Sequence, residues 1–451
     1  MEKKPFQVEY EKIEVPQDEV LQAIQIGINR ATATRSIKNR KKRLKPYLLL
    51  ASALLFITAS FISPSISYVM AEVPFIGKVY ENMNDFIGRN LASQQLITQL
   101  NETASNQGID ITIKSTYYDG AVIGATFYIT GDVQTEADGR LLGFYELFDG
   151  KKEIADSKEL VYLDPTEDGY AGHIQLYYPK TELPSNTTFP LEFKRIGTKE
   201  GVWKFDVPIQ QLPYTTIQLQ QKSSAIDAGI SVLFDTIMQG QASTAINYTA
   251  TFPREGKHDQ VRLEIFDDKG KQLPLLADGI DLETSKDQHS ITIKGRTIIS
   301  QPLAETTSHL TISPKVAVYE KDQFTTLEQP TPIHIDSARQ KLGVTVEKIT
   351  LKDKQLTIDF YFNSEHKDFI LFENFARNNI ELVEESEKEV YKKSIKHTTK
   401  AIDKDNLRFS STFNIGTVHN FSTDNYVLRV NFNALHANIP VELDAVKIDV
   451  N

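Results

Sequence analysis

An uncharged segment near the N-terminus constrains this chain more than any other feature. Residues 46–71 contain no Asp, Glu, Lys or Arg. As an α-helix this segment would be roughly 39 Å long at about 1.5 Å per residue, more than the ~30 Å hydrocarbon core of a bilayer. We therefore expect a single transmembrane helix at residues 46–71, with the lipid bilayer as a partner of the chain.

A basic cluster precedes this segment and predicts its orientation. Because Lys and Arg are retained on the cytoplasmic side of a membrane, the N-terminus is expected in the cytoplasm. The region after Glu72 is then extracellular, and the localisation is the cell membrane. The cluster consists of Lys38, Arg40, Lys41, Lys42, Arg43 and Lys45.

Two other interpretations of the apolar segment fit it less well. A buried core helix is usually shorter and does not adjoin so dense a basic patch. A cleaved signal peptide could use Val69 and Ala71 as its cleavage site, after a helix break at Pro64. Against this, 45 residues precede the segment, whereas a whole signal peptide has about 15 to 30 residues. We favour the uncleaved anchor.

The expected cytoplasmic tail, residues 1–45, contains one amphipathic helix. Pro16 and the acidic residues around it are typical of a helix start, and the helix would extend from about Gln17 to Ala31. So short a segment cannot bury its own apolar stripe, which favours binding to a partner protein. The alternative is a helix that lies on the inner membrane surface. The stripe comprises Val20, Leu21, Ile24 and Ile28.

Charge and composition limit the class of the exterior. The first 45 residues carry a net charge of +5 and the whole chain −10, so the remainder carries −15. An acidic exterior without a basic face argues against direct nucleic-acid binding. The chain has no cysteine, which excludes disulfides and thiolate metal sites and favours a Gram-positive type of cell.

Beyond the membrane the hydrophobic period changes. Helical spacing over residues 76–100 predicts an extracytoplasmic helical connector at 72–106. After Gly108 the period becomes 2, which predicts half-buried antiparallel strands. Examples are ITIK at 111–114, ATFYIT at 125–130, HIQLYY at 173–178, HSITIKG at 289–295 and QLTIDFYF at 355–362.

The strands are arranged in a weak repeat. Gly108, Gly229 and Gly343 each precede alternating aliphatic residues, at spacings of 121 and 114 residues. This is the size of one immunoglobulin-like sandwich of about 100 residues. The fold class is therefore mainly β, with a single transmembrane helix, a short helical segment and tandem immunoglobulin-like β-sandwich domains. The expected sandwiches are residues 107–214, 215–336 and 337–451, closing on strands at 202–207, 332–335 and 439–448.

The sequence contains no motif for catalysis. The nine histidines are scattered, and no glycine-rich phosphate loop or Gly-x-Ser-x-Gly elbow is present. The acidic segments at 164–169 and 403–406 fit turns better than calcium loops. We expect no enzyme activity, no catalytic residues, no metal and no cofactor.

Three segments carry a resemblance to a known family. They are IEVPQDEVLQAIQIGINRA (13–31), AEVPFIGKVYENMNDFIGRNL (71–91) and GIDITIKSTYYDGAVIGATFYI (108–129). With the basic patch and the single span, they resemble a family of Gram-positive single-pass membrane proteins of unknown function (DUF type). Its members are often encoded beside extracytoplasmic-function sigma factors and are regarded as candidate anti-sigma factors. The resemblance covers residues 13–210, and this tail lacks the His and Cys residues of zinc-type anti-sigma domains.

The resemblance implies an anti-sigma factor that couples an extracytoplasmic sensor region to a cytoplasmic sigma factor. Val20, Leu21, Ile24 and Ile28 would then be the partner-binding residues. The sandwiches would detect stress or an envelope ligand. The alternative is a non-enzymatic structural, ligand-binding or adhesion protein of the cell envelope, and an envelope hydrolase is third.

Overall fold

The structure is a computed structural model, and it describes Tyr80 and residues 84–136, 141–147, 158–183, 185–388, 394–419 and 421–450. Every described residue belongs to one compact unit, Ser67–Asn451. The expected tail and transmembrane helix lie outside the described residues. Within the ranges given above, no helix combines the length and apolar character needed to cross a bilayer.

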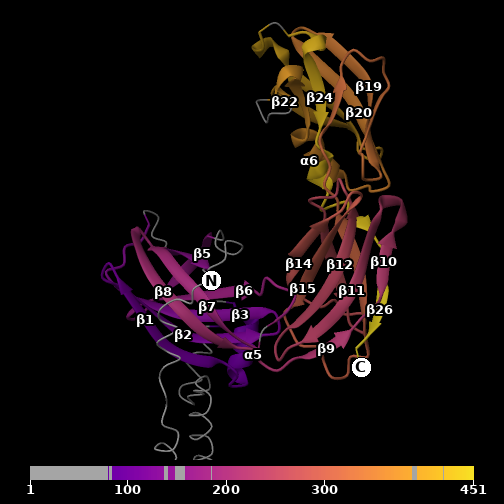
Figure 1. Cartoon of the computed structure of the whole chain (residues 1–451). Helices are drawn as coiled ribbons and strands as arrows, with labels where there is room; N and C mark the ends of the chain where they lie inside the picture. The colour runs from indigo at the N-terminus through magenta and orange to yellow at the C-terminus, as the bar shows by residue number, and fades with distance from the viewer. Residues whose placement is uncertain are drawn as a thin grey trace, which may run out of the picture. The chain divides into compact units, whose positions relative to one another are not determined.

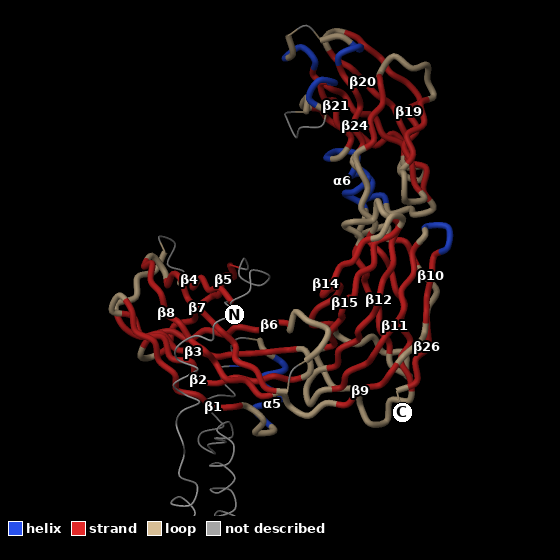
Figure 2. Tube along the Cα trace, in the orientation of Figure 1, coloured by secondary structure: helices blue, strands red, loops and turns tan. Residues whose placement is uncertain are grey.

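Strands dominate the described part of the chain, as Figure 2 shows. They form antiparallel sheets around three separate apolar cores, which confirms the expectation of a mainly β, sandwich-rich fold. The α-helices of the described ranges include α5 (Phe86–Ser93) and α6 (Phe369–Asn378). Short 3-10 helices are Ile226–Ala228, Glu385–Glu387, Ile415–Thr417, Thr423–Asn425 and Phe432–Leu435.

The first sandwich is one strongly bent sheet with the strand order β1-β2-β3-β6-β5-β4-β7-β8. It bends at β5, whose first half pairs with β4 and whose second half pairs with β6. As a result β8 contacts β1 and β2 (Figure 1). The bounds are β1 (Thr98–Asn106), β2 (Ile109–Asp119), β3 (Val122–Gly131), β4 (Leu142–Leu147), β5 (Lys158–Thr166), β6 (Gly169–Tyr177), β7 (Asn186–Ile196) and β8 (Lys199–Gln210).

The second sandwich has two sheets. One has the order β10-β11-β12-β15-β14, with β9 also paired to β11, and the other consists of β13, β16, β25 and β26. The last two of these strands come from the C-terminal end of the chain. The bounds are β9 (Thr215–Gln218), β10 (Lys222–Ala225), β11 (Ile230–Gln239), β12 (Thr244–Pro253), β13 (Gln260–Phe266), β14 (Leu275–Lys286), β15 (Ser290–Ile299), β16 (His309–Ala317), β25 (Val441–Glu442) and β26 (Val446–Asp449).

The third sandwich packs a sheet of order β18-β19-β20-β23-β22 against a sheet of order β17-β24-β21. Helix α6 lies beside β21, β22 and β23. The bounds are β17 (Gln323–Thr326), β18 (Ile333–Asp336), β19 (Leu342–Lys352), β20 (Gln355–Ser364), β21 (Ile380–Glu384), β22 (His397–Asp403), β23 (Arg408–Asn414) and β24 (Tyr426–Val430).

The predicted repeat is visible in the strand order. Strands β2, β11 and β19 each lie second in a series of five paired strands. The three series are β1-β2-β3-β6-β5, β10-β11-β12-β15-β14 and β18-β19-β20-β23-β22. Each begins within one residue of a glycine of the repeat, Gly108, Gly229 or Gly343. Gly108 and Gly229 have φ values of 73° and 65°, left-handed conformations that favour glycine at these positions.

The closing strands of the last two sandwiches differ from the prediction. Residues 332–335, expected to close the second block, overlap β18, which pairs with β19 in the third sandwich. Residues 439–448, expected to close the third block, contain β25 and most of β26, which pair with β16 in the second. The third sandwich is therefore inserted between β16 and β25. Alternation indicates that one face of a strand is buried, but it does not indicate which sheet the strand joins.

The expected helical connector is also shorter than predicted. Helix α5 ends at Ser93, and Gln95 has a φ of 61°, which a right-handed helix does not accommodate. Strand β1 begins at Thr98 and pairs with β2, so residues 98–106 are not helical.

Candidate functional site

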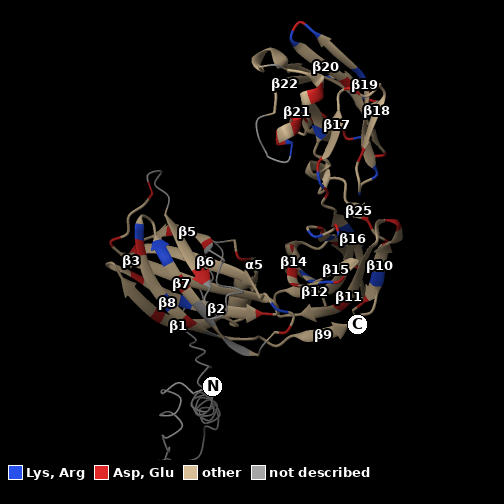
Figure 3. Ribbon diagram, turned by 45° about the horizontal axis from the view of Figure 1, so that its top comes forward, with Lys and Arg blue, Asp and Glu red and all other residues tan. Residues whose placement is uncertain are grey.

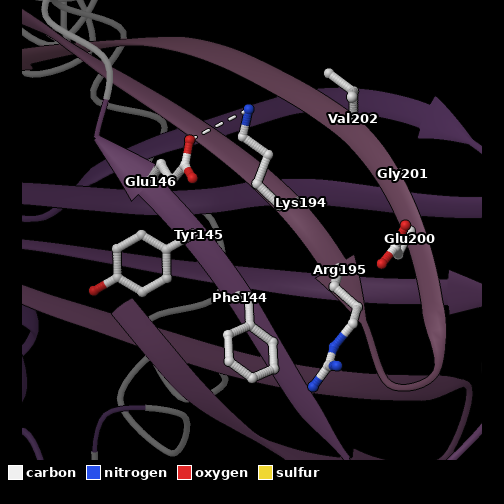
Figure 4. Close-up of a pocket in the computed structure, with 8 residues that line it drawn as sticks. All are labelled: Phe144, Tyr145, Glu146, Lys194, Arg195, Glu200, Gly201 and Val202. Carbon is white, nitrogen blue, oxygen red and sulfur yellow. Dashed lines mark ion pairs between the residues drawn. The ribbon is translucent and has the colours of Figure 1, made fainter. Parts of the chain in front are cut away.

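A pocket of about 640 Å³ lies on the outer face of the first sandwich (Figure 4). Strands β4, β7 and β8 form its floor. It combines an aromatic ring, aliphatic surface and charges of both signs, a mixture typical of sites that orient small ligands. Its lining residues are Phe144, Tyr145, Glu146, Lys194, Arg195, Glu200, Gly201 and Val202.

A bulge in β7 places two cations at this pocket. The register against β8 shifts between Phe193 and Arg195, so that Arg195 lies opposite Glu200. Phe193 is fully buried, whereas Lys194 and Arg195 are both partly exposed. A β-bulge interrupts the alternation of a strand and redirects a side chain in this way.

Arg195 is positioned by an aromatic ring. Its guanidinium carbon lies 4.1 Å from the centroid of the Phe144 ring, on the neighbouring strand β4. Its nearest acidic contact is long, 3.5 Å from Nη2 to Oε1 of Glu136. In the described part of the chain, Nε of Arg195 has no hydrogen-bond acceptor and Glu200 forms no ion pair. Arg195 and Glu200 are thus weakly compensated charges on adjacent strands.

Lys194 is neutralised by its neighbours. Its Nζ donates to Oε1 of Glu192 at 2.6 Å and lies 3.3 Å from Oε2 of Glu146. The hydrogen bond to Glu192 raises the pKa of Lys194 above its ordinary value. Burial alone would raise the pKa of Glu192, but Lys194 and Lys204 together hold that pKa below its ordinary value.

Exposed apolar side chains extend the pocket surface. Leu160 and Tyr162 on β5 are 41% and 60% exposed, and Val202 on β8 is 46% exposed. Leu160 is the cross-strand partner of Phe144. Exposed apolar surface grouped on one face is typical of an interaction site.

A second cluster joins helix α5 to the first sandwich. Asp85 caps the helix, its Oδ1 accepting from the backbone N–H of Gly88 at 2.9 Å. Its fully buried carboxylate also accepts from Tyr117 Oη at 2.8 Å and from Gln175 Nε2 at 2.9 Å. His173 Nε2 lies 2.8 Å from Oδ2. One carboxylate thus connects the helix to β2 and β6.

Helix α5 also packs into an apolar cluster shared by the first two sandwiches. Ile87 and Leu91 of the helix belong to the same buried cluster as Met238, Ala245 and Ile298 of the second sandwich. The residues after the expected span are therefore part of the contact between two sandwiches.

Polar contacts at this junction are buried as well. Asp119, at the end of β2, accepts from the backbone N–H groups of Gln241 and Ala242 at 2.6 and 3.0 Å, and from Ser243 Oγ at 2.8 Å. Burial raises the pKa of Asp119. Arg296 of β15 donates to the carbonyl of Tyr178 at 2.9 Å, and burial lowers its pKa to about 10.

A bidentate ion pair connects the second and third sandwiches. Nη1 and Nη2 of Arg339 lie 2.6 and 2.5 Å from the two oxygens of Asp259. Both side chains are at least nine-tenths buried. Glu320, in the connecting segment, accepts from the backbone N–H of Ala338 at 2.7 Å. These contacts join the start of β13 and the segment after β16 to the turn between β18 and β19.

The site residues predicted from the sequence are not among the described residues. Two sets are outside the described residues: the partner-binding residues Val20, Leu21, Ile24 and Ile28, and the topology residues Lys38, Arg40, Lys41, Lys42, Arg43 and Lys45. The acidic segments at 164–169 and 403–406 lie at turns between antiparallel strands. Across the described ranges, no group of three or more His, Asp or Glu side chains is arranged to hold a metal ion.

Neither the pocket nor the Asp85 cluster is among the sites predicted from the sequence. Two adjacent cations, Lys194 and Arg195, break the alternation of β7 and are the available signal for a bulge. Asp85 directly before a helix is an N-cap signal. Neither signal shows which distant residues complete the site.

Comparisons with known proteins give two family matches. Residues 39–131 match DUF4179, a domain of unknown function, and residues 214–336 match DUF5643, a family of unknown function. The first match includes α5 and β1 to β3, and the second includes most of the second sandwich. These matches confirm that the chain contains regions of unknown-function type.

Two solved structures are similar to part of the chain. A conserved domain protein from Bacillus anthracis has 18% identity and a TM-score of 0.39, over 52% of this chain and 83% of that chain. Bovine butyrophilin has 9% identity and a TM-score of 0.14, over 44% and 86%. Comparison with curated proteins finds no match.

Proposed function

We propose that this chain is a membrane-anchored regulator of the anti-sigma type in a Gram-positive cell. Residues 46–71 would cross the membrane once, with the tail in the cytoplasm and the sandwiches outside. The tail helix would hold an extracytoplasmic-function sigma factor inactive through Val20, Leu21, Ile24 and Ile28.

One observation carries this proposal. Helix α5 begins 15 residues after the expected span ends at Ala71, and it is built into the contact between the first two sandwiches. A change in that contact would act directly on the segment that leads into the membrane. A tether without a signalling role would not need to be integrated in this way.

The sandwiches would form the sensor region, and we propose that they are immunoglobulin-like. The ABED order of an immunoglobulin constant domain is matched by β2-β3-β6-β5, β11-β12-β15-β14 and β19-β20-β23-β22. Its CFG order is matched by β4-β7-β8, β13-β16-β25 and β21-β24-β17. In the third sandwich, β17 at the N-terminal side takes the place of the last strand. The pocket near Arg195 would receive the signal.

A second candidate is a non-enzymatic envelope protein that binds a ligand or adheres to a surface. The exposed residues Leu160, Tyr162 and Val202 beside the pocket favour it. In that case the tail would serve only as an anchor, and the cytoplasm would contain no specific partner.

Binding of the full-length protein, in detergent micelles, to purified extracytoplasmic-function sigma factors from the same cell separates the two. Replacing both Leu21 and Ile24 by Asp removes apolar burial of about 1.5 to 3 kcal/mol per side chain and introduces charge into an apolar groove. We expect affinity to fall more than about a hundredfold. The control, Gln22→Asp with Asn29→Asp, adds the same charge on the polar side of the helix and should bind normally. Equal affinities for both variants would contradict the proposal.

A further inference from the structure

We propose that the pocket on the first sandwich binds short peptides whose two termini are free. The amino terminus would contact Glu200, the carboxylate terminus would contact Arg195, and an apolar side chain would pack beside Phe144 and Val202. This inference rests on the proposed sensor function only for its biological role; the binding can be tested without a sigma factor.

Two opposite charges lie on adjacent strands of the pocket. Arg195 and Glu200 are direct cross-strand partners on β7 and β8, where opposite charges ordinarily pair. In the described residues they form no ion pair with each other, because the guanidinium is stacked on Phe144 instead. The pocket therefore presents one cation and one anion side by side.

The other charged side chains that line the pocket, Lys194 and Glu146, already form an ion pair. Lys194 is held by Glu192 and Glu146, at 2.6 and 3.3 Å. Arg195 has only its 3.5 Å contact with Glu136 as an ion pair, and a guanidinium with open donors prefers a planar carboxylate. A ligand with a single charge would complement only half of the remaining pair.

The pocket also presents apolar surface beside the two charges. Phe144 and Val202 line the pocket, and Val202 lies two residues after Glu200 on β8. Figure 4 shows the Arg195 side chain extending towards Phe144, away from Lys194 and Glu146. Charge complementarity with an adjacent apolar surface fits a zwitterionic peptide better than a neutral sugar.

The experiment is a calorimetric titration of the full-length protein, in detergent micelles, with the dipeptide alanyl-leucine. We expect saturable binding to one site. The N-acetylated dipeptide and the C-terminal amide should each bind at least about tenfold more weakly, because each lacks one of the two charges. Both comparisons use the unaltered protein, so they do not depend on the folding of a variant.

Variants then place the site. Arg195→Gln and Glu200→Gln should each weaken binding at least about tenfold, and Lys204→Gln, which removes a cation on β8 outside the pocket lining, should not. Equal affinity for the blocked and free dipeptides, or binding of the neutral disaccharide chitobiose in place of the dipeptide, would overturn the inference. If the dipeptide binds but the tail binds no sigma factor, the regulator proposal fails and the peptide site stands.

Discussion

Asp85 shows how much one buried carboxylate can organise. It accepts hydrogen bonds from the helix N-terminus, from Tyr117 and from Gln175, and His173 lies beside it. Several donors around one anion offset the cost of its burial. Removal of the carboxylate would leave those donors unpaired in the interior.

Asp85→Ala should lower the free energy of unfolding of the first sandwich by at least about 1 to 3 kcal/mol, the cost of leaving a buried hydrogen-bond donor without its acceptor. Trp203 is the single tryptophan of the chain and is fully buried in this sandwich, so its fluorescence during denaturation reports the right domain. Asp110→Ala, at an exposed position of β2, is the control. Equal losses in the two variants would contradict the role of Asp85.

We expect the stability of the turn between β14 and β15 to depend on pH through Asp287. Its carboxylate accepts from the backbone N–H groups of His289 and Ser290, both at 2.7 Å. The backbone hydrogen bond from His289 is the main cause that lowers the pKa of Asp287 to about 2. Because the pKa is depressed in the folded protein, the stabilisation is complete above the unfolded pKa of about 3.9 and is lost as the pH falls through about 2.

Carboxyl-carbon NMR titration of Asp287 should therefore give a midpoint near 2, and Asp287→Asn should remove the loss of turn stability in this pH range. A midpoint near the ordinary value of about 4 would show that the carboxylate does not hold the turn.

Strands β25 and β26 stabilise a different sandwich from the one that precedes them in sequence. They pair with β16, and Ile448 of β26 is fully buried in the core of the second sandwich. The third sandwich completes its smaller sheet with β17. The end of the chain therefore closes a domain that begins near Thr215.

Ile448→Ala should destabilise the second sandwich by about 2 to 5 kcal/mol and leave the third unchanged. Hydrogen exchange should accelerate in β13 and β16 but not in β19 and β20. Ile402→Ala, at an exposed position of β22, is the control and should change neither region. Faster hydrogen exchange confined to the third sandwich would contradict the pairing of β26 with β16 of the second sandwich.

The period of the sequence predicted individual strands well. In the segment at 355–362, alternation predicts one shared face for four side chains, and all four are buried in the third core: Leu356, Ile358, Phe360 and Phe362. The signal is local, because alternation depends only on neighbouring residues.

Long-range features could not be predicted in the same way. Strand 439–448 has an apolar pattern that suits either sandwich, and its choice depends on an insertion of more than 100 residues. Asp85 and His173 meet from positions 88 residues apart. The bulge that brings Arg195 to Phe144 changes a register, which no single strand specifies alone.

Contacts between successive sandwiches connect the described part of the chain. The Asp119 and Arg296 contacts and the shared apolar cluster join the first to the second, and the Asp259–Arg339 pair joins the second to the third. Helix α5 takes part in the first of these junctions. Such an arrangement would suit the proposed regulator, in which a change in these contacts acts on the residues that precede helix α5.

Transcription of the genes that the cell's extracytoplasmic-function sigma factors control, measured in unstressed cells, tests the central proposal most directly. Cells with the Leu21→Asp and Ile24→Asp double variant should express the genes of the bound sigma factor constitutively, because the tail no longer holds the sigma factor, while the protein stays in the membrane. Cells with Gln22→Asp and Asn29→Asp should keep them repressed. Repression that is equal in both strains, at equal protein levels, would contradict the regulator and favour the structural envelope protein.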